Sequence, residues 1–147
     1  RAPITALGRR FEITPVSMGN PHGVIFLDEP VETFELTKYG PALECHPAFP
    51  KKVNIEFVNV LSEKRLRMRV WERGSGVTLA CGTGATAAAI ITNYALQHGT
   101  TKYRIQVPGG ELIVGFTHEA GTQNYTNIRL TGPARRVFSG VFETDNF

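Results

Sequence analysis

The residues numbered 83–98, TGATAAAIITNYALQH, decide the fold of this chain. They predict one helix, and Gly99 directly after them supplies a helix stop. Ala, Ile and Leu cover nearly every side of this helix, and none of its residues is charged. A helix that is apolar all round has to be buried on all sides, whereas a surface helix shows a polar stripe. We therefore expect this helix to lie at the centre of the fold.

Strand-like segments fill most of the remaining chain, which is rich in Val, Ile and Phe and punctuated by Gly and Pro. Because the connections are short, the sheet should be mainly antiparallel. The sequence therefore predicts an α+β fold, a mainly antiparallel sheet curled into a barrel-like wrap around one central apolar helix. The expected strands are 11–17, 23–27, 53–61, 65–71, 103–107, 111–116, 125–130 and 135–142, and a short helix is expected over 33–39, stopped by Gly40 and Pro41.

Length and composition indicate one globular domain. The chain has 147 residues, of which 41% are hydrophobic and 20% are charged. The polar stretch 1–10 starts without Met and is interpreted as a linker or the start of a fragment, which leaves 11–147 as the domain. No apolar run reaches the ~18 residues that cross a bilayer, and no signal peptide is recognised. We expect a cytoplasmic protein without a membrane partner.

The densest basic run, KRLRMRVW at 64–71, alternates strictly between charged and apolar residues from Arg65 onward. This period of two is typical of a half-buried strand whose polar face is solvated. A nucleic-acid surface would carry aromatic or amide side chains among the charges, and none lies between the charged residues of this run. With a net charge of only +3, we expect no nucleic-acid partner.

Two cysteines, Cys45 and Cys81, lie far apart in the sequence and are expected to be free thiols. With four His and no clustered cysteines, no metal site is expected. Cys45 is interpreted as a small buried hydrophobic residue. Cys81 differs because it directly precedes the central helix, in the stretch GSGVTLACGTG at 74–84.

The helix start around Cys81 suits acid–base chemistry. Unpaired N–H groups and the helix dipole favour a thiolate there, which would lower the pKa from ~8.5 to within ~3.5–7.5. The glycines would let a ligand approach, so that the N–H groups of Gly82, Thr83 and Gly84 could hold a carboxylate or phosphate. The loop lacks the Lys of a P-loop and the Arg of a cysteine phosphatase. A base beside an anion site suits removal of a proton next to a carboxylate.

Seven pieces of the sequence, which span nearly the whole chain after residue 10, resemble the diaminopimelate epimerase family of cofactor-independent amino-acid epimerases. These pieces are SMGNPH (17–22), HPAFP (46–50), VNIEFV (53–58), RVWERG (69–74), ACGTGA (80–85), VPGG (107–110) and GPA (132–134). One departure is Val77, where the family often has Glu. That position is not assigned to chemistry.

The resemblance covers only the C-terminal domain of that family. It implies two similar domains, each with one catalytic Cys at the start of its central helix, and the Cys-Gly-Asn-Gly motif of the N-terminal domain is not in this chain. A thiolate on one face would take the α-proton while the opposite thiol delivers another, which interconverts LL- and meso-diaminopimelate in lysine and peptidoglycan precursor synthesis. The partners it implies are the missing domain, the substrate and a second copy in a homodimer. No cofactor is implied, and the fragment alone is expected to be inactive.

The resemblance also assigns roles to individual residues. Cys81 would be one of the two bases, His22 would help to set its protonation, and Gly82 with Thr83 would hold the reacting carboxylate. The distal end of the substrate would be bound by Asn20, Asn54, Glu72 and Arg73, with Glu72 accepting from the ammonium and Arg73 pairing with the carboxylate.

Two alternatives differ in function. A proline racemase or related isomerase would share the fold, although proline has no distal groups for Glu72 and Arg73 to bind. A non-catalytic domain that binds an anion or a partner is the second alternative.

Overall fold

The computed structural model describes residues 1–144, which form a nine-stranded sheet and two helices. The predicted mixed α+β class is confirmed. In chain order the elements are β1 (Ala2–Ala6), β2 (Arg9–Ser17), β3 (Pro21–Phe26), α1 (Leu36–Glu44), β4 (Asn54–Ser62), β5 (Arg65–Glu72), β6 (Gly76–Thr78), α2 (Gly82–Leu96), β7 (Lys102–Val107), β8 (Gly110–His118) and β9 (Tyr125–Thr131).

The strands follow the order β1-β2-β3-β4-β5-β7-β8-β9, and β6 pairs with β5. Only β3–β4 and β5–β7 are parallel, and each of these pairs is connected through a helix, α1 in the first and α2 in the second. The remaining pairs are antiparallel, as expected. The helices therefore occupy the two crossover connections that parallel pairing requires.

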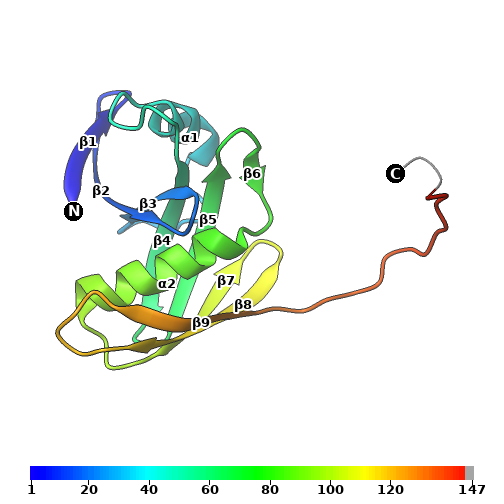
Figure 1. Ribbon diagram of the computed structural model, residues 1–147. Helices are drawn as coiled ribbons and strands as arrows, with labels where there is room; N and C mark the ends of the chain where they lie inside the picture. Colours follow the sequence, from blue (N-terminus) through cyan, green and yellow to red (C-terminus); the bar gives the residue numbers. More distant parts are fainter. Residues whose placement is uncertain (145–147) are drawn as a thin grey trace.

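The apolar helix α2 lies at the centre, as its composition predicts. It contacts β2, β3, β4, β5, β7, β8 and β9, and its residues from Gly84 to Asn93 are buried. Figure 1 shows the sheet curling around this helix. The end strands β1 and β9 are not paired with each other, so within residues 1–144 the sheet stays open. The closed barrel-like wrap is therefore not confirmed.

Two apolar cores lie on opposite faces of the sheet centre. Ile55 and Phe57 of β4 pack with the core beneath α1, whereas Val58 packs with the core around α2. Because side chains alternate along a strand, Glu56 shares the α2 face with Val58. The central strands are thus buried on both faces, and this arrangement carries one acidic side chain toward the start of α2.

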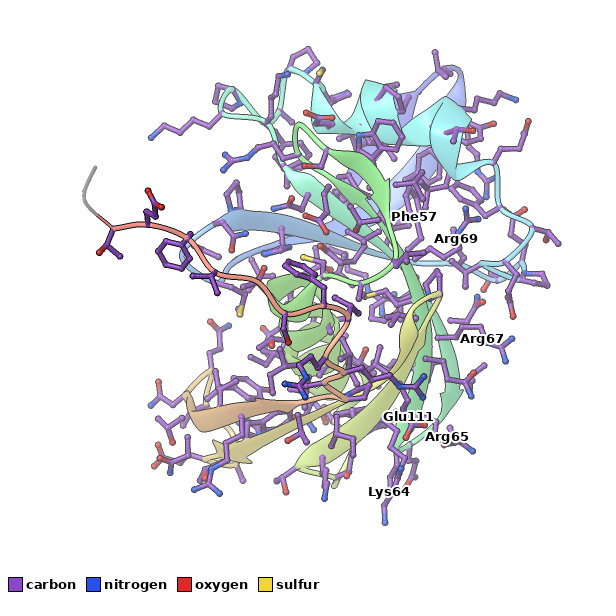
Figure 2. All side chains as sticks on the ribbon, turned by 90° about the vertical axis from the view of Figure 1, so that its right-hand side faces the viewer. Phe57, Lys64, Arg65, Arg67, Arg69 and Glu111 are labelled. Carbon is purple, nitrogen blue, oxygen red and sulfur yellow. The ribbon has the colours of Figure 1, made fainter. Side chains whose placement is uncertain are left out.

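The basic run lies on β5 with the alternation that the sequence predicts. Its apolar residues Leu66 and Met68 are fully buried. Figure 2 shows Arg65 and Arg67 on the outer side of the sheet, with Glu111 near Arg65. Arg67 forms an ion pair with Glu32. These basic side chains are therefore paired with acidic side chains of the same chain.

Three expected boundaries differ from the structure. The stretch 1–10, predicted as a linker, forms β1 and the start of β2, because Ile4 and Ala6 alternate with exposed residues and reach the core. The first helix runs from Leu36 to Glu44 and passes through Gly40 and Pro41, which were expected to stop it.

Gly40 is needed inside α1 because a Cβ there would lie 2.5 Å from the indole of Trp71, so this glycine serves close packing rather than termination. The expected strand 135–142 carries no regular structure, and Figure 1 shows this part of the chain running away from the body of the fold. Within residues 1–144, neither helix has the length and hydropathy needed to cross a bilayer.

Candidate active site

Cys81 is the N-cap residue of α2, with an extended backbone, and its side chain is half-buried. Its sulfur accepts a hydrogen bond from the backbone N–H of Gly84 at 3.3 Å. The hydroxyl of Thr83 lies 3.6 Å from the same sulfur. An N-cap side chain that accepts from the third helical residue satisfies one of the free N–H groups of the first turn. The sequence thus placed this thiol correctly at the helix start.

The predicted direction of the pKa shift of Cys81 is wrong for this chain. Burial raises the pKa of the thiol, and the hydrogen bonds from Thr83 and Gly84, which act to lower it, do not compensate. The charge of Glu72 raises it further, and so does that of Glu56 whenever its carboxyl group is ionised. A helix start favours a thiolate, but desolvation, the largest effect, and the charge of Glu72 outweigh it here. Cys81 is therefore held in its thiol form.

The anion site was expected to use three backbone N–H groups, and only two of them are free to bind a ligand. The N–H of Gly84 is taken by the sulfur of Cys81, whereas within residues 1–144 no protein group accepts from the N–H of Gly82 or Thr83. The glycines also make room for protein rather than ligand. A Cβ on Gly82 would lie 2.7 Å from Leu130, and one on Gly84 would lie 2.7 Å from a carboxyl oxygen of Glu56.

Glu56 is the residue of this region that sequence reasoning did not assign. Its side chain is fully buried on β4, and its Oε1 lies 2.6 Å from Nδ1 of His22, which is also buried. Burial raises the pKa of Glu56 to about 7, although its contact with His22 acts in the opposite direction. The signal that could have found it is a single acidic residue inside an otherwise apolar strand.

Asn20 joins His22 to the start of α2. Its Oδ1 lies 3.1 Å from Nε2 of His22, and its Nδ2 donates to the hydroxyl of Thr83 at 3.4 Å. The structure therefore brings four predicted site residues, Asn20, His22, Cys81 and Thr83, into one connected group. Asn20 is thus linked to the thiol through the hydroxyl of Thr83.

Glu72 lies at the end of β5, half-buried, and accepts a hydrogen bond from the hydroxyl of Thr78 at 2.5 Å. Its charge acts on both Cys81 and Glu56. Thr78 lies on β6, which pairs with the end of β5, so the short strand that the sequence did not predict orients this carboxylate.

Asn54 and Arg73 are brought together, but through the protein itself. Oδ1 of Asn54 accepts from the backbone N–H of Arg73 at 2.9 Å, and Nδ2 donates to the carbonyl of Pro21 at 2.9 Å. The guanidinium of Arg73 is exposed and donates to the carbonyl of Lys51 at 3.1 Å. Substrate binding by these two residues stays a prediction.

Cys45, expected to be a buried apolar side chain, is exposed at the C-cap of α1 and is a free thiol. Position explains this difference, since Cys45 follows the last residue of α1 and lies outside the face of the helix that packs on the core. Its exposure makes it a useful internal reference for the half-buried Cys81.

Two hollows of about 600 Å³ each lie beside Arg67 and beside His98, and Cys81 lines neither. A smaller hollow borders Thr83 between β2 and β9. Leu79, shortly before Cys81 in the chain, is 69% exposed, and Leu130, whose side chain lies next to Gly82, is 47% exposed. The face that carries Cys81 is thus open and apolar.

Solved structures with similar folds place the chain in a class. It superposes on a PhzC/PhzF phenazine biosynthesis protein from Clostridium difficile with a TM-score of 0.51, at 19% identity, over 71% of this chain and 39% of that one. This likeness defines the fold: a sheet curled around an apolar helix.

The sequence comparisons identify the family within that class. The diaminopimelate epimerase profile matches residues 14–137. The diaminopimelate epimerase of Carboxydothermus hydrogenoformans is 44% identical over 95% of this chain and 48% of its own length. That of a Synechococcus species is 48% identical over 96% of this chain and 48% of its own length. The chain belongs to the diaminopimelate epimerase family, and it spans about half the length of the curated relatives it matches.

Proposed function

We propose that this chain is the C-terminal half of a cofactor-independent epimerase that interconverts LL- and meso-diaminopimelate. The observation that carries the proposal is the half-buried thiol of Cys81 at the N-cap of α2, beside the free N–H groups of Gly82 and Thr83. Family membership supports the reaction class and the substrate. The reaction belongs to lysine and peptidoglycan precursor synthesis, which fits a cytoplasmic enzyme.

The chemistry follows from the position of the thiol. The N–H groups of Gly82 and Thr83 would bind the carboxylate next to the reacting carbon and stabilise the negative charge that builds on it. Cys81, held as a thiol, would deliver its proton to one face of that carbon. A thiolate from the other half would remove the α-proton from the opposite face, so each turnover moves one negative charge from one sulfur to the other.

The remaining predicted residues take supporting roles in this proposal. Glu72, oriented by Thr78, would accept from the distal ammonium, and Arg73 would turn from the carbonyl of Lys51 to the distal carboxylate. Asn20 and Asn54 would complete the distal pocket, and His22 would act on the thiol through Asn20.

The open face around Cys81 is the surface that the other half would cover. It carries the exposed Leu130, which lies next to Gly82, and the exposed Leu79, shortly before Cys81 in the chain. Closure would exclude water from the reacting carbon and strengthen each polar contact. We further propose that the barrel-like wrap is completed only in the full-length protein, and that two copies form a homodimer. Light scattering of the full-length protein tests the homodimer.

Hydrogen exchange tests the proposed reaction. Full-length protein incubated with LL-diaminopimelate in D₂O should place deuterium at the α-carbon and produce the meso form. The same protein with Cys81→Ala should lose epimerisation by at least about a thousandfold, as expected for removal of a proton donor. Cys45→Ala is the matched control and should retain full activity. Undiminished epimerisation by Cys81→Ala would overturn the proposal.

The half-site aspect has its own test. The 147-residue chain alone should exchange no α-hydrogen, because it supplies only one of the two bases. Exchange at the rate of the full-length protein would show that one thiol suffices and would remove the need for a second domain.

A further inference from the structure

Glu56 is a buried acidic side chain that the proposed reaction does not use directly. It is fully buried on β4, at the face that points to the start of α2. Its Oε1 faces His22, and among the described residues nothing hydrogen-bonds to its Oε2. A buried carboxylate with one oxygen unpartnered is costly, so this position requires an explanation.

The carboxyl group begins a continuous series of polar contacts that ends on the sulfur. We call this series the buried relay. Its distances are 2.6 Å, 3.1 Å, 3.4 Å and 3.6 Å in order along the series. The members of the buried relay, from its inner end to its outer end, are Glu56, His22, Asn20, Thr83 and Cys81.

The middle of the buried relay fixes the direction in which protons are donated. Nδ2 of Asn20 donates to the hydroxyl of Thr83, so Oδ1 of Asn20 is left to accept from His22. Nε2 of His22 must therefore carry a proton. The hydroxyl of Thr83, which receives one donor from Asn20, is free to donate its own hydrogen to the sulfur.

The inner end fits the same direction. A neutral imidazole with its proton on Nε2 has a lone pair on Nδ1, and that lone pair needs a donor. The protonated carboxyl of Glu56 supplies one at 2.6 Å. Each hydrogen bond of the buried relay is then donated in the direction of the sulfur. In a low-dielectric interior, hydrogen bonds in such a series polarise one another cooperatively.

We propose that Glu56 is a positioning residue of the thiol site: its buried carboxyl group fixes the tautomer of His22 and thereby aims the buried relay at the sulfur of Cys81. This inference gives a role to a residue outside the substrate contacts. The inference rests on the proposed function in one respect, namely that Cys81 exchanges protons with the substrate.

The electrostatic surroundings of Glu56 favour a neutral carboxyl group below about pH 7. Burial raises its pKa to about 7, and the charge of Glu72 on the adjacent strand raises it as well. The groups that face it are His22 on β3, Glu72 on β5 and Cys81 at the start of α2. A charged Glu56 would raise the pKa of the thiol, so the neutral form also keeps the thiol easier to ionise.

Two neutral replacements separate hydrogen bonding from charge. Glu56→Gln keeps a donor, since its amide N–H can reach Nδ1 of His22. Glu56→Leu has similar bulk and no donor. Without it, the proton of the imidazole can move to Nδ1, Asn20 then reverses its amide, and Thr83 donates to Asn20 instead of to the sulfur.

The probe is iodoacetamide, and the readout is the alkylation rate of Cys81 against pH in a Cys45→Ser background. At pH 7.5 the Glu56→Leu protein should react about three- to tenfold more slowly than Glu56→Gln, the effect of one hydrogen bond to a thiolate. Circular dichroism should be the same for both. Because the two variants carry the same charge, a merely electrostatic role would leave their rates equal.

Equal profiles for folded Glu56→Leu and Glu56→Gln would overturn the proposal. If the Leu variant does not fold, the last hydrogen bond of the buried relay can be tested at the exposed Thr83 instead. Thr83→Val removes the hydroxyl that contacts the sulfur, whereas Thr83→Ser keeps it. Equal alkylation profiles for these two variants would also overturn the proposal. No substrate is needed in either assay. Failure of this inference is therefore distinct from failure of the proposed epimerase, which the deuterium exchange decides.

Discussion

The indole N–H of Trp71 donates to Oε2 of Glu44 at 2.7 Å, and Oε1 of the same carboxylate accepts from the backbone N–H of Gly74 at 3.1 Å. Glu44 lies at the end of α1 and is only 6% exposed. It thus ties the first helix to the turn that carries Glu72 and Arg73. Sequence reasoning did not single out this contact.

Glu44→Gln should lower the free energy of unfolding by about 1–3 kcal/mol at pH 7, because the amide cannot accept from both donors. Burial alone would raise the pKa of Glu44, but the hydrogen bonds from Trp71 and Gly74 and the nearby Lys52 lower it overall. A lowered folded pKa gives stability that is present above the unfolded value of about 4.3 and is lost as the pH falls through the folded value. Urea unfolding should show the difference between variant and wild type shrinking toward pH 3, and a constant difference would contradict this.

Cys81 should react with iodoacetamide more slowly than Cys45 in the isolated chain at neutral pH. Burial raises the pKa of Cys81, so a smaller fraction is thiolate, whereas Cys45 is exposed. Peptide mass spectrometry of a partly alkylated sample gives both rates at once, and denatured chain is the reference in which they should converge. Faster alkylation of Cys81 than of Cys45 in the folded chain would instead support the thiolate that the sequence predicted.

Thr78→Val should leave the fold intact, since Val suits a strand, but it removes the donor that lies 2.5 Å from Glu72. We expect kcat/KM of the full-length enzyme to fall about tenfold, as for the loss of one hydrogen bond to a charged group. Thr78→Ser keeps the hydroxyl and should stay near wild type. Equal kinetics for the two variants would show that Glu72 is oriented by other means.

Gly84→Ala should destabilise the chain by about 1–3 kcal/mol, because overpacking a filled site forces its neighbours to move. The added methyl would lie 2.7 Å from Oε1 of Glu56 and 3.2 Å from the sulfur of Cys81. Gly99→Ala is the matched control, since nothing lies within 4 Å of a Cβ there. Thermal unfolding of both variants should separate them by several degrees. Equal unfolding temperatures for the two variants would mean that the side chain of Glu56 can move away from the added methyl group without loss of stability.

The sequence by itself determined the fold class, the central helix and most of the strands. Uncharged Ala and Ile around α2 could be stable only if strands covered them, and the alternation from Arg65 to Val70 set the buried face of β5. The position of Cys81 at the helix start could likewise be predicted from the residues directly around it. These features depend on periodicity and chain order, which neighbouring residues encode.

Only the tertiary structure decided the state of the site. Glu56 meets His22 across 34 residues of sequence, and this pairing depends on the parallel register of β3 and β4. The pKa of Cys81 rises instead of falling because of what packs around it, which no local motif contains. Desolvation and long-range contacts are properties of the assembled fold, and for this reason the sequence located the thiol while the structure determined its protonation.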